Sequence, residues 1–110
     1  MANYTFKKTD GGPIDKVKAE KWMKRFKYKH GDEAIRAYFF GTDMIRRILE
    51  HPEAVGMRVY LSLNEDENDK TQMVLLGARA DGSDIWIKDS GKDGAESGGD
   101  NGLPCPPYCS

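Results

Sequence analysis

Apolar side chains recur at helical spacing in two segments of the chain. Between Pro13 and Gly31 they lie three and four residues apart, which predicts a helix with one apolar face; Pro13 suits a first helical turn and Gly31 a left-handed cap. A second, short helix is predicted after Thr42, a good N-cap residue, and Pro52 would end it. The two apolar faces are Ala19, Trp22, Met23, Phe26 and His30 in the first helix, and Met44, Ile45, Ile48 and Leu49 in the second.

Strand patterns follow the second helix. Residues 57–63 (MRVYLSL) alternate strictly between apolar and polar, which predicts a half-buried strand, and residues 71–80 are its expected hairpin partner across the polar loop 64–70. Residues 85–87 (IWI) could add a short strand. The run 35–40 would suit a helix or a buried strand, and its bulky residues Tyr38, Phe39 and Phe40 favour the strand.

These elements predict an α+β fold in which two helices pack on one face of a small antiparallel sheet, in the order helix-strand-helix-strand-strand. The α+β domain is expected at residues 3–88. Residues 89–110 include five glycines, and Leu103 and Tyr108 are their only large apolar side chains. Such a segment is expected to be a flexible, disordered tail. A domain of this size buries a modest core, so a homodimer would add stability.

Charge is distributed unevenly along the chain. Residues 1–30 carry nine Lys or Arg against three acids, whereas residues 61–110 carry four against ten, and the net charge is −1. The basic residues expected on the surface of the first helix are Lys16, Lys18, Lys24, Arg25, Lys27 and Lys29. This end could meet an acidic partner, but the acidic remainder argues against nucleic acid, for which phosphate contacts dominate affinity.

Neither a secretory signal nor an apolar run of membrane-spanning length is visible in the sequence. The expected location is therefore the cytoplasm, without a membrane partner, although export without a standard signal peptide stays open. In the cytoplasm thiols are normally reduced.

Four quoted stretches carry a family resemblance: "AEKW", "FFGTDMIRRIL", "VGMRVYLSLNEDENDKTQMVLLGARADG" and "PCPPYC". Together they resemble a group of small bacterial proteins with an α+β body and a C-terminal PCPPxC tail. The resemblance implies that body and tail belong to one gene product. It implies no activity, cofactor or catalytic residue.

No cofactor or metal is expected. The loop residues Asn64, Asp66 and Asn68 match the first ligand positions of a calcium loop, but Asp69 replaces the required glycine and Leu75 the bidentate glutamate. The soft ligands for zinc are His30, His51, Cys105 and Cys109, and their spacing matches no zinc module.

Two regions remain as candidate sites. Arg58, Tyr60 and Ser62 share the polar face of a strand and would suit a small enzyme if they lined a recess. The tail motif comprises Cys105, Pro106, Pro107, Tyr108 and Cys109. In an extended polyproline II conformation its cysteine Cα atoms would lie about 12 Å apart, too far for a disulfide without a turn at the prolines.

The function favoured by this pattern is a non-enzymatic binding or carrier module whose tail is recognised or modified by a partner protein or a processing enzyme. Three alternatives remain: a precursor whose cysteine peptide is processed or exported, a small enzyme using the polar strand face, and thiol redox chemistry or metal capture by the tail. No catalytic residue is assigned.

Overall fold

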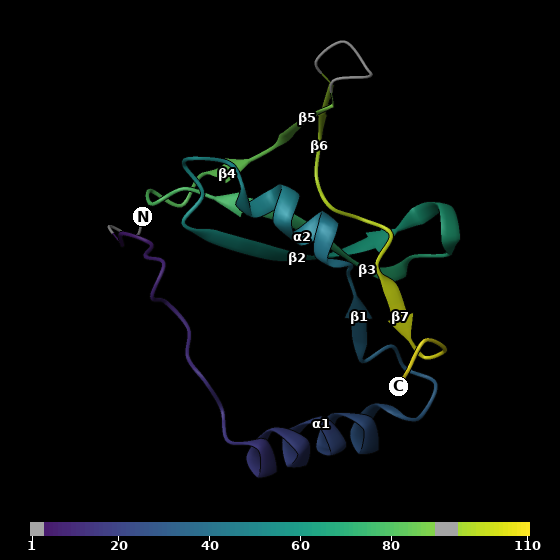
Figure 1. Cartoon of the computed structure of the whole chain (residues 1–110). Coiled ribbons are helices and arrows are strands. Elements are labelled where there is room, and N and C mark those ends of the chain that lie inside the picture. Colours follow the sequence, from purple (N-terminus) through teal and green to yellow (C-terminus); the bar gives the residue numbers. More distant parts are fainter. Residues whose placement is uncertain (1–3, 90–94) are drawn as a thin grey trace. The chain divides into compact units, whose positions relative to one another are not determined.

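The computed structural model describes residues 4–89 and 95–110 and confirms the α+β class (Figure 1). Residue 3, the first residue of the expected domain, and residues 90–94 of the expected tail lie outside the described residues. The chain forms two compact units, one from residues 1–10 and 40–102 and the other from residues 11–39 and 103–110. The division therefore differs from the sequence expectation, because both units draw on the C-terminal segment.

The first unit is built on an antiparallel sheet with the strand order β2-β3-β4. Strands β2 (Gly56–Asn64) and β3 (Lys70–Ala78) pair along their whole length, from Gly56 opposite Ala78 to Asn64 opposite Lys70. The short 3₁₀ helix η1 (Glu65–Glu67) and two residues with positive φ join them. The predicted hairpin across the acidic loop is thereby confirmed.

Helix α2 (Thr42–Leu49) contacts β2 and β3 and supplies the most deeply buried side chain of the described residues. Ile48, only 2% exposed, lies against Gly77 of β3. The other buried apolar residues are Leu75, Leu76 and Ala78 of β3 and Ile85 of β4 (Asp84–Ile85). The predicted apolar face of this helix therefore does contribute to the core.

The C-terminal segment of the first unit is ordered against β3. Strands β5 (Ile87–Asp89) and β6 (Ala95–Ser97) form an antiparallel pair, and Gly99 then exchanges two backbone hydrogen bonds with Leu75, of 2.8 and 2.9 Å. The predicted strand at 85–87 is thus divided between β4 and β5. For the described residues, the prediction of a disordered tail is wrong.

Close approach explains this order. A Cβ atom placed on Gly98 would lie 2.8 Å from Leu76 Cδ2, and one on Gly99 would lie 3.1 Å from both Ile48 Cδ1 and Leu75 Cβ. Glycine permits the backbone to dock here because it has no side chain. The composition that indicated flexibility instead serves packing.

The second unit contains helix α1 (Lys16–His30) and the antiparallel strands β1 (Ala37–Phe39) and β7 (Leu103–Cys105). The Asp15 carboxylate caps α1 by accepting a 3.1 Å hydrogen bond from the Lys18 amide, and Gly31, at φ 91°, follows its last turn. The predicted strand at 35–40 is thus a shorter one, paired with residues that the sequence assigned to the tail. Of the two predicted helices, α2 covers the sheet, whereas α1 belongs to the second unit and has no buried residue.

We expect Gly99→Ala to lower the free energy of unfolding by about 1–3 kcal/mol, because the added methyl group would overpack the contact with Ile48 and Leu75. Gly56→Ala is the matched control, since a Cβ atom there meets nothing within 4 Å. Urea denaturation of the full chain measures both. Equal stability of the two variants would contradict the docking of Gly99 on β3.

Candidate functional site

The C-terminal motif is closed into a loop by a disulfide between Cys105 and Cys109, whose Cα atoms lie 4.9 Å apart. The expected extended conformation is therefore wrong. The chain turns at Pro106 and Pro107, each of which follows a cis peptide bond. Within the turn the Tyr108 amide donates to the Pro104 carbonyl over 2.9 Å, and the Cys109 amide donates to Pro107 over 3.0 Å. The motif is thus a compact loop.

Arg36 connects this loop to the segment that precedes β1. Its amide donates a 2.9 Å hydrogen bond to the Cys105 carbonyl, which continues the pairing of β1 with β7. Its guanidinium group contacts Cys109 Sγ at 3.6 Å and the Asp32 carbonyl at 3.4 Å. Arg36 therefore contacts the loop at both cysteines. No sequence motif indicated this role for Arg36.

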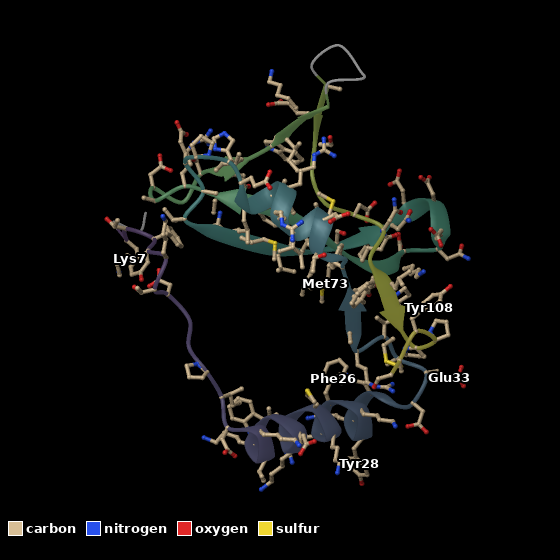
Figure 2. All side chains as sticks on the ribbon, in the orientation of Figure 1. Lys7, Phe26, Tyr28, Glu33, Met73 and Tyr108 are labelled. Atoms are coloured by element: carbon tan, nitrogen blue, oxygen red, sulfur yellow. A yellow bond between two sulfur atoms is a disulfide. The ribbon has the colours of Figure 1, made fainter. Side chains whose placement is uncertain are left out.

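A recess of about 620 Å³ lies between this loop and α1 within the second unit. Figure 2 shows Phe26 on the side of α1 nearer the loop and Tyr28 on the other side. The residues lining the recess are Trp22, Met23 and Phe26 of α1, Arg36 and Ala37, and Cys105, Tyr108, Cys109 and Ser110 of the loop. We call this recess the loop groove. Its large apolar side chains, which are Trp22, Met23, Phe26 and Tyr108, are each more than one third exposed and can contact a ligand.

The surface beside the loop groove is strongly basic. Helix α1 contains seven Lys or Arg residues and one acid, Glu20. All six predicted basic positions are exposed on it: Lys16, Lys18, Lys24, Arg25, Lys27 and Lys29. Lys18 lies 5.6 Å from the centroid of the Trp22 ring, a cation–π geometry. The helix therefore combines aromatic side chains with positive charge.

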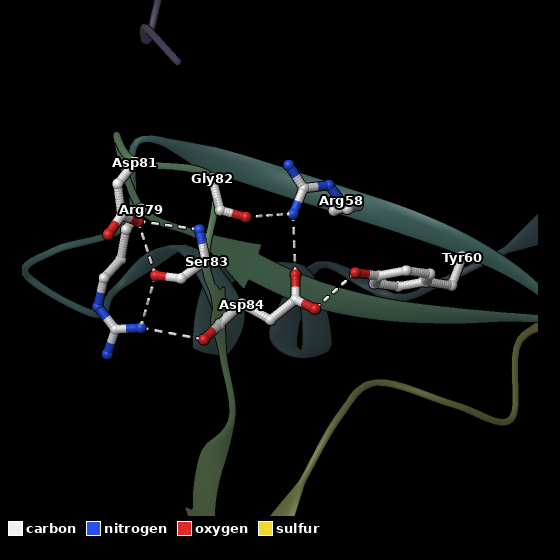
Figure 3. Close-up of polar contacts among 7 residues, drawn as sticks. All are labelled: Arg58, Tyr60, Arg79, Asp81, Gly82, Ser83 and Asp84. Carbon is white, nitrogen blue, oxygen red and sulfur yellow. Dashed lines mark hydrogen bonds and ion pairs between the residues drawn. The ribbon is translucent and has the colours of Figure 1, made fainter. Parts of the chain in front are cut away.

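The other predicted site, the polar face of β2, is occupied by internal hydrogen bonds (Figure 3). Arg58 donates to the Gly82 carbonyl over 2.7 Å and to Asp84 Oδ1 over 3.0 Å, while the Tyr60 hydroxyl donates to Asp84 Oδ2 over 2.5 Å. Asp84 thus joins two of the three predicted residues, a role that the sequence did not indicate. The third, Ser62, donates to the Gln72 carbonyl over 3.1 Å.

These contacts fasten the β3–β4 turn to the sheet. Arg58 also lies under the Phe6 ring, 5.2 Å from its centroid, and lines a recess of about 400 Å³ whose walls include neither Tyr60 nor Ser62. This recess therefore does not bring the three polar residues together. The hydrogen bonds of Arg58 and Tyr60 to Asp84 give both residues a structural role at the turn.

Carboxylate pKa values near the turn follow their hydrogen bonds. Asp81 Oδ1 accepts from the Ser83 amide over 2.9 Å and from its hydroxyl over 2.7 Å, and these two bonds lower the pKa of Asp81 (Figure 3). Arg79 forms an ion pair with Glu53, and the hydrogen bond in that pair lowers the pKa of Glu53. Asp81 and Glu53 are thus stabilised in their charged form.

No group of three or more His, Cys, Asp or Glu side chains suited to a metal ion occurs within residues 4–89 and 95–110. His51 Nδ1 instead accepts the Glu53 amide over 3.1 Å, and the His30 ring stacks 4.4 Å from that of Phe26. In the same part of the chain, no helix has the length and apolar character needed to cross a membrane.

Scans of protein-family models, of curated proteins and of solved structures find no match to this chain.

We expect the pKa of Tyr60 to fall in Asp84→Asn, because the hydrogen bond to the Asp84 carboxylate raises it above the ordinary value. A pKa raised by folding means that Tyr60 stabilises the fold below about pH 10 and that this contribution is lost as pH rises through the raised value. Tyrosinate absorbance of each protein, minus that of its Tyr60→Phe counterpart, measures the titration. Asp81→Asn is the control and should leave it unchanged.

We expect the native protein to resist thiol alkylation, because its two cysteines are joined to each other. Intact mass should show no adduct before reduction and two after it. Cys105→Ser provides the control, since its remaining thiol should take one adduct without reductant. Two adducts on the unreduced native protein would contradict the disulfide.

Proposed function

We propose that this chain is a non-enzymatic binding module in which the loop groove and the basic surface of α1 recognise an acidic segment of a partner protein. The observation that carries the proposal is the disulfide-closed loop, whose Tyr108 lines the same groove as Trp22 and Phe26 of α1. The sequence pointed to the same C-terminal residues as the recognition element. The geometry supports a folded loop in that role in place of an extended peptide.

The chemistry of the groove supports a particular ligand class. Aromatic and methionine side chains supply apolar anchoring area, and aromatic residues often dominate binding energy at interfaces. Arg36 is the cationic side chain within the groove, and the lysines of α1 extend the positive charge alongside it. A segment with one apolar anchor flanked by Asp or Glu would complement both features.

The alternatives drawn from the sequence receive less support. A loop that is closed at Cys105 and Cys109 and paired through β7 offers a processing enzyme little extended backbone. Arg58, Tyr60 and Ser62 are engaged in internal hydrogen bonds, and the recess that Arg58 lines includes neither Tyr60 nor Ser62, so it lends the enzyme alternative no support. Thiol exchange keeps one supporting contact, that of Arg36 with Cys109, since a guanidinium group would stabilise a thiolate there.

The disulfide also bears on where the module would act. Disulfides persist in oxidising compartments and are rare in the reducing cytoplasm. The sequence led us to expect a cytoplasmic protein. The Cys105–Cys109 bridge instead supports a site of action outside the cytoplasm. Export without a standard signal peptide is the route that the sequence left open.

Binding can be tested with a fluorescent peptide of about ten residues, rich in Asp and Glu and carrying one tryptophan anchor. We expect Phe26→Ala to weaken binding about tenfold or more, because it removes one apolar wall of the groove. Tyr28→Ala is the matched control: Tyr28 is also an aromatic residue of α1, is 91% exposed and does not line the groove. Fluorescence anisotropy at low and high salt measures both, and affinity should fall with salt.

The Cys105→Ser, Cys109→Ser double variant tests the loop itself and should also lose affinity. Equal losses in Phe26→Ala and Tyr28→Ala would overturn the groove as the binding site. Tight binding of a lysine-rich peptide of the same length would overturn the acidic class. A mixed disulfide between the native protein and a cysteine-containing probe would instead indicate thiol exchange.

A further inference from the structure

Strand β2 presents a row of apolar side chains to solvent. Met57, Val59, Leu61 and Leu63 alternate along one face and are 36%, 47%, 74% and 67% exposed. Their cross-strand neighbours on β3 include Leu75 and Gly77, and both of these are buried. The same sheet face is therefore closed over β3 and open over β2, and contiguous exposed apolar side chains of this kind mark interaction surfaces.

The outer edge of β2 is also open. In the sheet order β2-β3-β4, no strand of the described residues pairs with that edge, along nine residues. Exposed edges are normally protected by charges, proline or bulges, because their free amide and carbonyl groups template further pairing. Residues 56–63 contain one charge, Arg58, and it is engaged with Asp84. The residues of β2 themselves therefore give this edge none of the usual protection.

Identical strands can pair antiparallel about a twofold axis, since each then presents the same edge to the other. If the axis passes at Tyr60, the midpoint of β2, Val59 lies opposite Leu61 of the second copy and Met57 opposite its Leu63. Arg58 lies opposite Ser62 of that copy, so no like charges face each other. The strand is thus complementary to itself in both apolar pattern and charge.

We propose that the chain forms a homodimer by antiparallel pairing of β2 with β2 of a second copy, in the register that places Tyr60 on the twofold axis. The two three-stranded sheets become one continuous sheet, and the two apolar rows come side by side. A second β2 strand would pair the free backbone groups of the edge and also cover its apolar side chains. A helix or an irregular loop would cover the side chains alone. This proposal is independent of ligand binding at the loop groove.

A single pair of strands buries less surface than a standard interface, so we expect a dissociation constant in the range of about 1–100 µM. Analytical ultracentrifugation of the full chain across that range should show a monomer–dimer equilibrium. The disulfide-intact protein is used throughout.

The register is tested by two double variants that remove the same apolar side chains. In Val59→Lys, Leu61→Lys each substituted position faces a lysine of the second copy, whereas in Val59→Lys, Leu61→Glu each substituted lysine faces a glutamate. We expect the first variant to dimerise at least about tenfold more weakly than the second. Val17→Glu is the control for an exposed valine outside β2 and should dimerise like the parent chain.

Both double variants should keep the fold, because positions 59 and 61 are exposed, and circular dichroism checks this. A parent chain that stays monomeric up to about 1 mM would overturn the proposal. Equal dimerisation of the two double variants would overturn the Tyr60-centred register. Loss of the dimer in Val17→Glu would place the contact on α1 instead.

Discussion

The first unit depends on the burial of strand β3. Its residues pair with β2 on one side and with β4 and Gly99 on the other, and Leu75 and Leu76 are almost fully buried. Helix α2 closes one face through Ile48. Few side chains of the described residues are buried in this way, so each neighbour of β3, including the backbone at Gly98 and Gly99, contributes a large share of the stability.

The elements that the sequence predicted well are those whose signal is local. The apolar face of α2 records burial on a single element, and the alternation of β2 records the two-residue period of a strand although its apolar row is exposed, so a periodic pattern is sufficient to find both. The hairpin of β2 and β3 follows because an acidic loop joins two adjacent strand patterns. The α+β class rests on these same elements.

The C-terminal segment was misread because its order depends on distant residues. Glycine is enriched in flexible chains and also where two backbones approach closely, and composition does not separate the two uses. Gly99 is ordered by its contacts with Leu75 and Ile48, which lie more than twenty residues away in sequence. The loop could not be predicted from local sequence either. The sequence suggested an extended proline pair, which would keep Cys105 and Cys109 apart, whereas the observed chain turns at the prolines and brings the two cysteines together. For Arg36 no local signal exists at all.

The uneven charge of the chain acquires a structural meaning from the two units. Residues 11–39 contain eight Lys or Arg and four acids, whereas residues 40–102 contain seven and thirteen. The positive charge therefore gathers on the unit that bears the loop groove, and the negative charge on the unit that bears the open edge of β2. The charge of the second unit therefore attracts an acidic segment, and the charge of the first unit repels one. The charge distribution is thus consistent with the two proposals, in which an acidic segment binds the basic unit and self-association uses a different surface of the chain.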